Sequence, residues 1–186
     1  MTITWPLPGL DVAIPQEPDH PGSFAAVRKY DIHTGVDLYA PEGQQVVAIE
    51  DGVVVFIDRM FTGGEDTPKG EDGEPVWLQT AAIGISGKSG VILYGELTLV
   101  EKDSCGFDLD LGSPFKAGDV IGTVKRVLKD KPDGRTFQNP AESPSMLHLE
   151  LYRPRSPYAA WWRHGEPRPR GLRDPTELLL KARERM

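Results

Sequence analysis

The chain has 186 residues and a net charge of −7, and its 20 glycines and 17 prolines make up about a fifth of its length. Both residue types interrupt helices, which argues against a helical bundle, and a hydrophobic content of 39% is too high for a disordered chain. The acidic balance disfavours nucleic acid and anionic membranes as general partners. We therefore expect one mainly β domain with many loops and its own core.

The charge is distributed unevenly along the chain. Residues 1–152 carry 12 basic and 24 acidic side chains, whereas residues 153–186 carry 9 basic and 4 acidic ones. We interpret the C-terminal part as a solvated, arginine-rich element, with a contact site for an acidic partner as the alternative.

We expect neither an export signal nor a membrane anchor. Cys105 is the only cysteine, so a disulfide within the chain is impossible. The first fifteen residues lack a cationic start and a continuous apolar core, and no segment has the length of a transmembrane helix. These features predict a cytoplasmic protein without a membrane span.

The first 29 residues contain five prolines and are expected to form an irregular lead-in. A domain over residues 30–180 should follow, with a short tail at residues 181–186. Apolar, β-branched segments at residues 45–49 and 53–57 flank Asp51-Gly52 and predict a hairpin. Further strands are predicted at residues 91–94, 120–124 and 146–152.

Two long polar segments, residues 62–75 and 129–145, interrupt the β pattern. Loops of this length in a compact domain are often functional, and we expect these two to form the walls of a groove. The C-terminal part has two helix candidates. One starts at Ser156-Pro157 and ends near Gly165, and the other starts at Asp174-Pro175 and continues to Arg185.

His33, Asp37 and His148 are the residues that could carry metal chemistry. His33 and Asp37 lie on one face of an extended chain but about 13 Å apart, so a bend near Gly35 is needed to bring them onto one metal. His148 lies on the predicted strand at residues 146–152, where a lone histidine is usually a hydrogen-bonded core residue. Two histidines and a carboxylate are nonetheless a standard ligand set for catalytic zinc, with one position left open.

The opening segment of this set has a recognisable pattern. The run from His33 to Gly43 (HTGVDLYAPEG), followed by Val46-Val47-Ala48 and Asp51-Gly52-Val53-Val54, is similar to the opening motif of the M23 metallopeptidases, the lysostaphin- and LytM-like zinc endopeptidases.

Later segments are similar to further motifs of that family in the same order, from about Tyr30 to Leu180. The family's Tyr-x-His-Leu segment corresponds to Tyr94-Gly95-Glu96-Leu97, and its Gly-x-x-Ile-Gly segment corresponds to Gly118-Asp119-Val120-Ile121-Gly122. Its His-x-His-x-Glu segment corresponds to Met146-Leu147-His148-Leu149-Glu150, and its Asn/Asp-Pro segment corresponds to Asp174-Pro175. The resemblance implies a mainly β fold, an antiparallel sheet of the barrel-sandwich-like M23 type with short C-terminal helices.

The resemblance also implies roles for individual residues. His33, Asp37 and His148 match the three zinc ligands of the family. Met146 stands where the family has the histidine usually taken as general base, and Glu96 stands where it has the histidine that holds the developing oxyanion. Both catalytic histidines that do not bind zinc are therefore replaced.

The closing strand allows a second alignment, in which His148 is the first histidine of the pair and Glu150 is the zinc ligand. We prefer His148 as the ligand, because the family's glutamate normally follows the ligand histidine by two residues, as Glu150 does here. Glu150 then lies behind the ligands or faces solvent.

These replacements imply a zinc-binding, M23-like protein with a degenerate catalytic site, a weak or altered peptide hydrolase at most. A thioether at Met146 cannot accept a proton. Glu96 is a candidate substitute base, as glutamate is in other zinc peptidases, but its carboxylate would oppose an oxyanion. The family's usual substrates are peptide cross-bridges of bacterial cell walls, so a peptide or a peptidoglycan-like ligand is the expected partner.

Two alternatives remain open. The first is a non-catalytic module that binds a peptide or a glycan in the family's groove, in effect a pseudoenzyme with a regulatory role. The second is a phosphocarrier of the sugar-transport type, which would carry phosphate on a histidine. A phosphocarrier would need a second histidine beside the first, and it would not need zinc.

Overall fold

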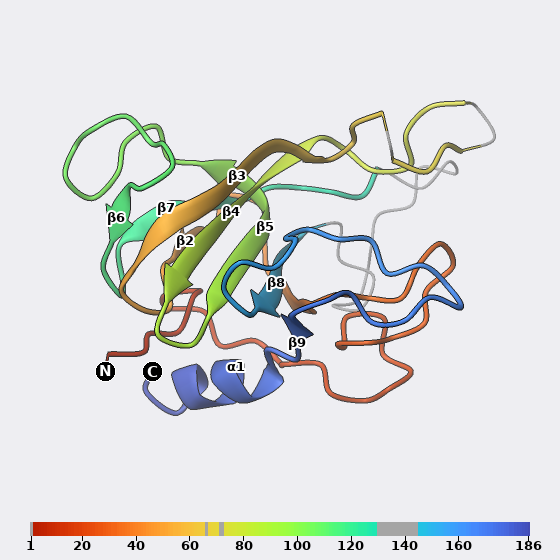
Figure 1. Ribbon diagram of the computed structural model, residues 1–186, viewed down its shortest axis with the longest axis horizontal. Coiled ribbons are helices and arrows are strands. Elements are labelled where there is room, and N and C mark those ends of the chain that lie inside the picture. The colour runs from red at the N-terminus through yellow and green to blue at the C-terminus, as the bar shows by residue number, and fades with distance from the viewer. Residues whose placement is uncertain (1, 66, 71–72, 130–144) are drawn as a thin grey trace.

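The computed structural model describes residues 2–65, 67–70, 73–129 and 145–186 (Figure 1). It is mostly antiparallel β-sheet, as predicted, and its described residues contain one short C-terminal helix. The elements in chain order are β1 (Val36–Tyr39), β2 (Gln45–Val47), β3 (Gly52–Thr62), β4 (Thr80–Gly87), β5 (Val91–Leu99), β6 (Pro114–Phe115), β7 (Val120–Val124), β8 (Met146–Tyr152), β9 (Leu172–Arg173) and α1 (Thr176–Arg183).

The sheet has the strand order β1-β8-β5-β4-β3-β6, and β5 is its centre. β5 pairs with β4 on one side and with β8 and then β7 on the other, while β2 extends β7 and β9 extends β8. Long-range pairing of this kind brings residues from distant parts of the chain together in the middle of the sheet. The metal-binding candidates lie there, on and beside β8.

Alternation of side chains decides which residues of β8 reach the core. Leu147, Leu149 and Leu151 point into the main hydrophobic cluster and are at most 3% exposed. The residues between them point to the opposite face, because neighbouring side chains of a strand alternate. Met146, His148 and Glu150 therefore share one face, as the sequence predicts.

The proline-rich lead-in packs against the sheet. It has no helix or strand in its described part, residues 2–29, yet Trp5, Leu7 and Ile14 are buried in the same cluster as the leucines of β8. The Trp5 indole donates a hydrogen bond of 2.8 Å to the Leu10 carbonyl. The lead-in thus contributes part of the core.

The hairpin expected around Asp51-Gly52 is wrong. Both strands form, but β2 pairs with β7, and β3 pairs with β4 and β6. The Asp-Gly signal is local, whereas the partner of β2 lies more than seventy residues further along the chain.

The helix expected from Ser156 to Gly165 is also wrong, since this segment is irregular. Ala159, inside this segment, has a positive φ angle of 54°, which lies outside the right-handed helical region, and Arg155 just before the segment has one of 62°. The Tyr158 ring packs instead against Tyr152, with ring centroids 5.6 Å apart. The second helix candidate forms as α1, and the Asp174 carboxylate accepts a hydrogen bond of 2.9 Å from the Thr176 backbone N–H.

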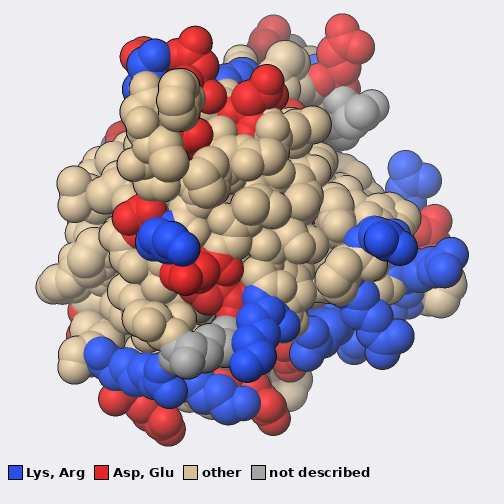
Figure 2. Space-filling model, turned by 60° about the vertical axis from the view of Figure 1, so that its left-hand side comes forward, with Lys and Arg blue, Asp and Glu red and all other residues tan. Residues whose placement is uncertain are grey.

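The surface reflects the uneven charge of the sequence. In Figure 2, lysines and arginines gather along the bottom and the lower right, where Figure 1 places α1 and the chain after β8. Acidic side chains are prominent at the top of the same view. No helix in the described residues is long and apolar enough to cross a membrane.

Candidate metal centre

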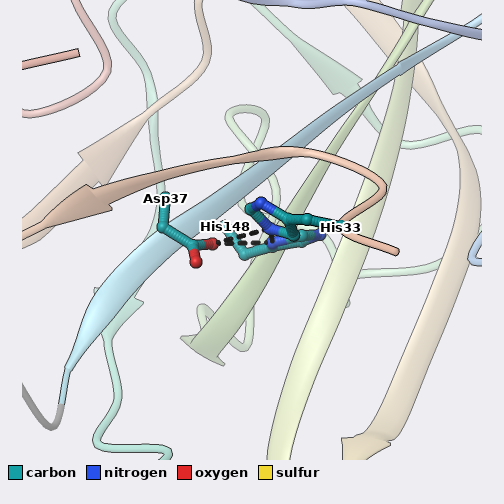
Figure 3. A group of neighbouring side chains, drawn as sticks. All are labelled: His33, Asp37 and His148. Atoms are coloured by element: carbon teal, nitrogen blue, oxygen red, sulfur yellow. Dashed lines mark hydrogen bonds and ion pairs between the residues drawn. The ribbon is translucent and has the colours of Figure 1, made fainter. Parts of the chain in front are cut away.

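His33, Asp37 and His148 converge on one point, as Figure 3 shows. His33 Nε2 lies 3.0 Å from His148 Nδ1 and 3.2 Å from Asp37 Oδ1. His148 Nδ1 and Asp37 Oδ1 are 2.8 Å apart. Tetrahedral ligands at about 2.0–2.1 Å from a zinc ion would lie about 3.3 Å from one another. These residues therefore fit a divalent metal if the donor atoms move apart by a few tenths of an ångström.

The backbone bend at Gly35 makes this convergence possible. β1 begins just after the bend, and its pairing with β8 sets Asp37 opposite His148. A Cβ at Gly35 would lie 2.3 Å from the backbone oxygen of Leu149, so only glycine allows this close approach to β8. His33, on the far side of the bend, turns back toward Asp37 as the sequence analysis requires.

The second nitrogen of each imidazole is also hydrogen-bonded. His33 Nδ1 donates to the Ser23 carbonyl at 2.8 Å, and His148 Nε2 lies 3.1 Å from Glu150 Oε1. Such partners orient the ring of a metal-binding histidine and hold its other nitrogen toward the metal.

Glu150 lies behind His148, away from His33 and Asp37. Its carboxylate also accepts hydrogen bonds from Thr34 and, at 2.9 Å, from the Tyr152 hydroxyl. Glu150 thus contacts the ring of His148 and is not one of the three converging donors.

The buried charges around the triad influence one another. Burial lowers the pKa of His33 and favours its neutral form. Burial would raise the pKa of Asp37, but His33 and Arg28 outweigh it and hold this pKa well below its usual value. Burial likewise opposes a charge on His148, but Asp37 and Glu150 raise its pKa to about 10. A metal on Nδ1 would take the place of that proton, because metal ligands must be deprotonated.

Arg28 is a site residue that the sequence analysis did not identify. Its Nη2 pairs with Asp37 Oδ2, the oxygen that does not face the histidines, and its Nε donates to the Pro21 carbonyl at 2.7 Å. From the sequence alone Arg28 could bind an acidic group or face water, and we expect the latter. No local pattern indicated otherwise, because the contact forms only when the lead-in folds over β1.

Glu96 lies at a break in β5. Between Tyr94 and Leu97 two residues of β5 oppose the single residue Ala82 of β4, and β5 changes its partner from β8 to β7 at the same place. Glu96 has a positive φ of 63°, a backbone conformation that is strained for most residues. A β-bulge redirects the side chain of the extra residue, and the buried Glu96 side chain lines the groove beside the triad.

Two hydroxyls hold the Glu96 carboxylate. Oε2 accepts hydrogen bonds from Thr80 at 2.7 Å and from Thr62 at 3.2 Å. Burial nevertheless dominates and raises the pKa of Glu96 to about 7. A carboxyl group that titrates near neutral pH suits proton transfer.

Glu96 should make the stability of the metal-free protein fall with rising pH. Its pKa of about 7 lies above the ordinary glutamate value of 4.5. The folded state therefore holds a proton that the unfolded state releases between these values, and stability is lost as pH rises through 7. We therefore compare the effect of Glu96→Gln on the free energy of unfolding at two pH values. This effect should be more favourable at pH 8 than at pH 4 by up to about 3 kcal/mol.

Urea unfolding at both pH values, with a chelator present, measures this difference. Glu65→Gln, at an exposed position of the same groove, controls for the loss of one negative charge. An equal effect of Glu96→Gln at both pH values would contradict the assigned environment of Glu96.

A groove of about 730 Å³ opens over the triad. Its lining includes Glu96 and Met146 together with part of the predicted 62–75 wall, namely Thr62, Gly64, Glu65 and Thr67. Of the other predicted wall, residues 130–144 lie outside the described part of the chain. Aromatic rings form the rim: Trp77 lies 6.2 Å from both Tyr30 and Trp161, measured between ring centroids.

Comparison with known proteins gives matches in structure only. No protein-family model matches the sequence, and no curated protein matches it significantly. The catalytic domain of lysostaphin from Staphylococcus simulans, described as an antimicrobial peptidase, is 18% identical with a TM-score of 0.51, over 91% of this chain and 92% of that domain. The protein cbpa from L. salivarius REN is 16% identical with a TM-score of 0.51, over 100% and 99% of the two chains.

A putative M23 peptidase from Pseudomonas aeruginosa is 14% identical with a TM-score of 0.49. The match covers 96% of this chain but only 50% of that longer protein. The full-length match to the lysostaphin domain, together with the strand order and the single C-terminal helix, establishes the architecture. The chain therefore has the fold of the M23 peptidases.

Proposed function

We propose that this protein binds one zinc ion through His33, Asp37 and His148 and uses the groove above it to bind peptides, with weak hydrolysis at most. The observation that carries the proposal is the convergence of three buried donor groups from two strands and the bend before β1. Their chemistry is that of catalytic zinc sites, in which the metal polarises a carbonyl and acidifies water.

The residues around the triad support a degenerate site. Met146 begins β8 beside the ligands and presents a thioether, which accepts no proton at neutral pH. Glu96 can accept a proton, but its negative charge would repel the oxyanion of the reaction. Any residual hydrolysis would then depend on Glu96 as a substitute base.

A hydrolysis assay tests this division of roles. Zinc-loaded wild type should cleave pentaglycine or a wall-type peptide slowly or not at all. Glu96→Gln should abolish any residual turnover if Glu96 is the base and change nothing if the site is inert. Liquid chromatography of the products measures both. Robust turnover that survives Glu96→Gln would contradict the proposal and would place the base on another residue.

A purely binding module is the second candidate. The preserved groove with its aromatic rim favours it, because peptide binding needs the cavity but no base. The phosphocarrier alternative is weaker, although His148 does lie beside His33. Asp37 and Glu150 contact His148 and would repel a phosphoryl group.

A further inference from the structure

Arg28 is the one arginine in the described lining of the groove. The lead-in carries it across the start of β1, where its side chain is 28% exposed while the Asp37 side chain beneath it is 3% exposed. A permanent cation thus lies between a buried metal-ligand candidate and the open groove. The proposed zinc chemistry makes no use of it beyond its contact with Asp37.

The guanidinium of Arg28 has donors to spare. It is a rigid fork with five N–H groups. Nε is bound to the Pro21 carbonyl and Nη2 to Asp37. Nη1 has no partner among the described residues. The edge formed by Nη1 and the remaining Nη2 hydrogen has the geometry that a carboxylate accepts with both oxygens.

The contacts to Pro21 and Asp37 also fix this edge in place. A guanidinium that is held by two partners loses little further side-chain entropy when it binds an anion. Lys29 lines the groove next to it, with Nζ 5.0 Å from the Tyr30 ring centroid, and adds a second positive charge. Three further carboxylates line the groove: Asp58 on β3, Glu65 after β3, and Asp31, whose backbone carbonyl accepts a hydrogen bond of 2.8 Å from the Arg28 backbone N–H. They disfavour anions elsewhere along the groove, so an anion binds best directly on the Arg28 guanidinium.

We infer that Arg28 is the residue by which the groove recognises its ligand, and that the ligand is a peptide with a free C-terminal carboxylate seated on the Nη1 edge. The inference rests on the proposed function for the peptide nature of the ligand. It does not depend on hydrolysis. Arg28 thereby has two roles: it orients Asp37 with one edge and binds the ligand with the other.

Two probes that differ only in their C-terminus test this inference. N-acetyl-triglycine and N-acetyl-triglycinamide both lack the amino charge, so only the terminal carboxylate distinguishes them. The indole N–H signals of Trp77, Trp161 and Trp162, which line the groove, report binding by NMR. Trp5 is buried in the core and supplies an internal reference.

Wild type should bind the acid about tenfold or more tightly than the amide, as expected for a charge-assisted pair of hydrogen bonds. Arg28→Gln should reduce this preference to about threefold or less. Arg28→Lys can still pair with Asp37 but has no second edge, so it should lose the preference as well. Lys88→Gln, at an exposed position on the turn between β4 and β5 outside the groove lining, should keep the preference.

Equal binding of acid and amide to wild type, undetectable binding of both at millimolar concentration, or an undiminished preference in Arg28→Gln would each overturn the inference. The titrations are run with zinc and with a chelator. Failure to bind zinc would contradict the proposed function, whereas the acid-to-amide ratio with the chelator tests Arg28 alone. A preference that survives in Arg28→Gln only with zinc would assign carboxylate binding to the metal and would also overturn the inference.

Discussion

Purified protein is expected to bind one zinc ion per chain, and His33→Ala and His148→Ala are each expected to lose it. Each variant removes one of the three donors, and no other histidine among the described residues belongs to this cluster. Residues that only orient zinc ligands change affinity by about 10- to 100-fold, so loss of a ligand should weaken binding by more than about 100-fold. Affinity should also fall as pH falls, because both histidines must be neutral to bind.

Elemental analysis after gel filtration measures the zinc content, and competition with a chelating dye measures the affinity. His164→Ala is the matched control, since this histidine is exposed and its Nε2 donates to the Asp31 carbonyl at 3.0 Å. It should keep its zinc. Full occupancy in both triad variants would remove this site from consideration.

Met146→His combined with Glu96→His is expected to raise peptide hydrolysis by about 100-fold or more above wild type. The first change supplies a proton acceptor at the start of β8, and general bases contribute about 10²- to 10⁴-fold. The second replaces a carboxylate that opposes the oxyanion with a group that can donate to it, an effect of about 10²- to 10³-fold in other enzymes. Histidine also tolerates the positive φ at position 96 better than most residues do.

The comparison is made on zinc-loaded proteins with the same pentaglycine peptide. Met60→His adds a histidine at an exposed position of the same groove and controls for a non-specific imidazole effect. It should leave turnover at the wild-type level. A double variant that binds zinc, folds and remains as slow as wild type would show that Met146 and Glu96 do not limit the site.

Much of the fold could be predicted because its central strands carry strong local signals. The bounds predicted for β7 and β8 match the structure, and β8 alternates between core leucines and groove-facing polar residues. The pairing of β2 could not be predicted, because Asp51-Gly52 favours a local turn while the partner strand is remote. The absence of a helix at residues 156–165 depends on packing of Tyr158 and on positive φ angles that composition does not reveal.

The candidate site also has parts that the sequence predicts and parts that it does not. The bend at Gly35 and the pairing of β1 with β8 explain how His33 and Asp37 meet His148, which the motifs anticipated. Arg28 could not be found from the motifs, because it belongs to an irregular segment and reaches Asp37 only through tertiary folding. The bulge that sets Glu96 in place also depends on pairing of β5 with three strands.

Anomalous diffraction at the zinc absorption edge, from crystals of protein loaded with one equivalent of zinc, tests the central claim most directly. The account predicts a single strong peak within bonding distance, about 2.0–2.2 Å, of His33 Nε2, Asp37 Oδ1 and His148 Nδ1, the three atoms that converge in Figure 3. A peak bound by Glu150 in place of His148, or no peak at this triad, would contradict it.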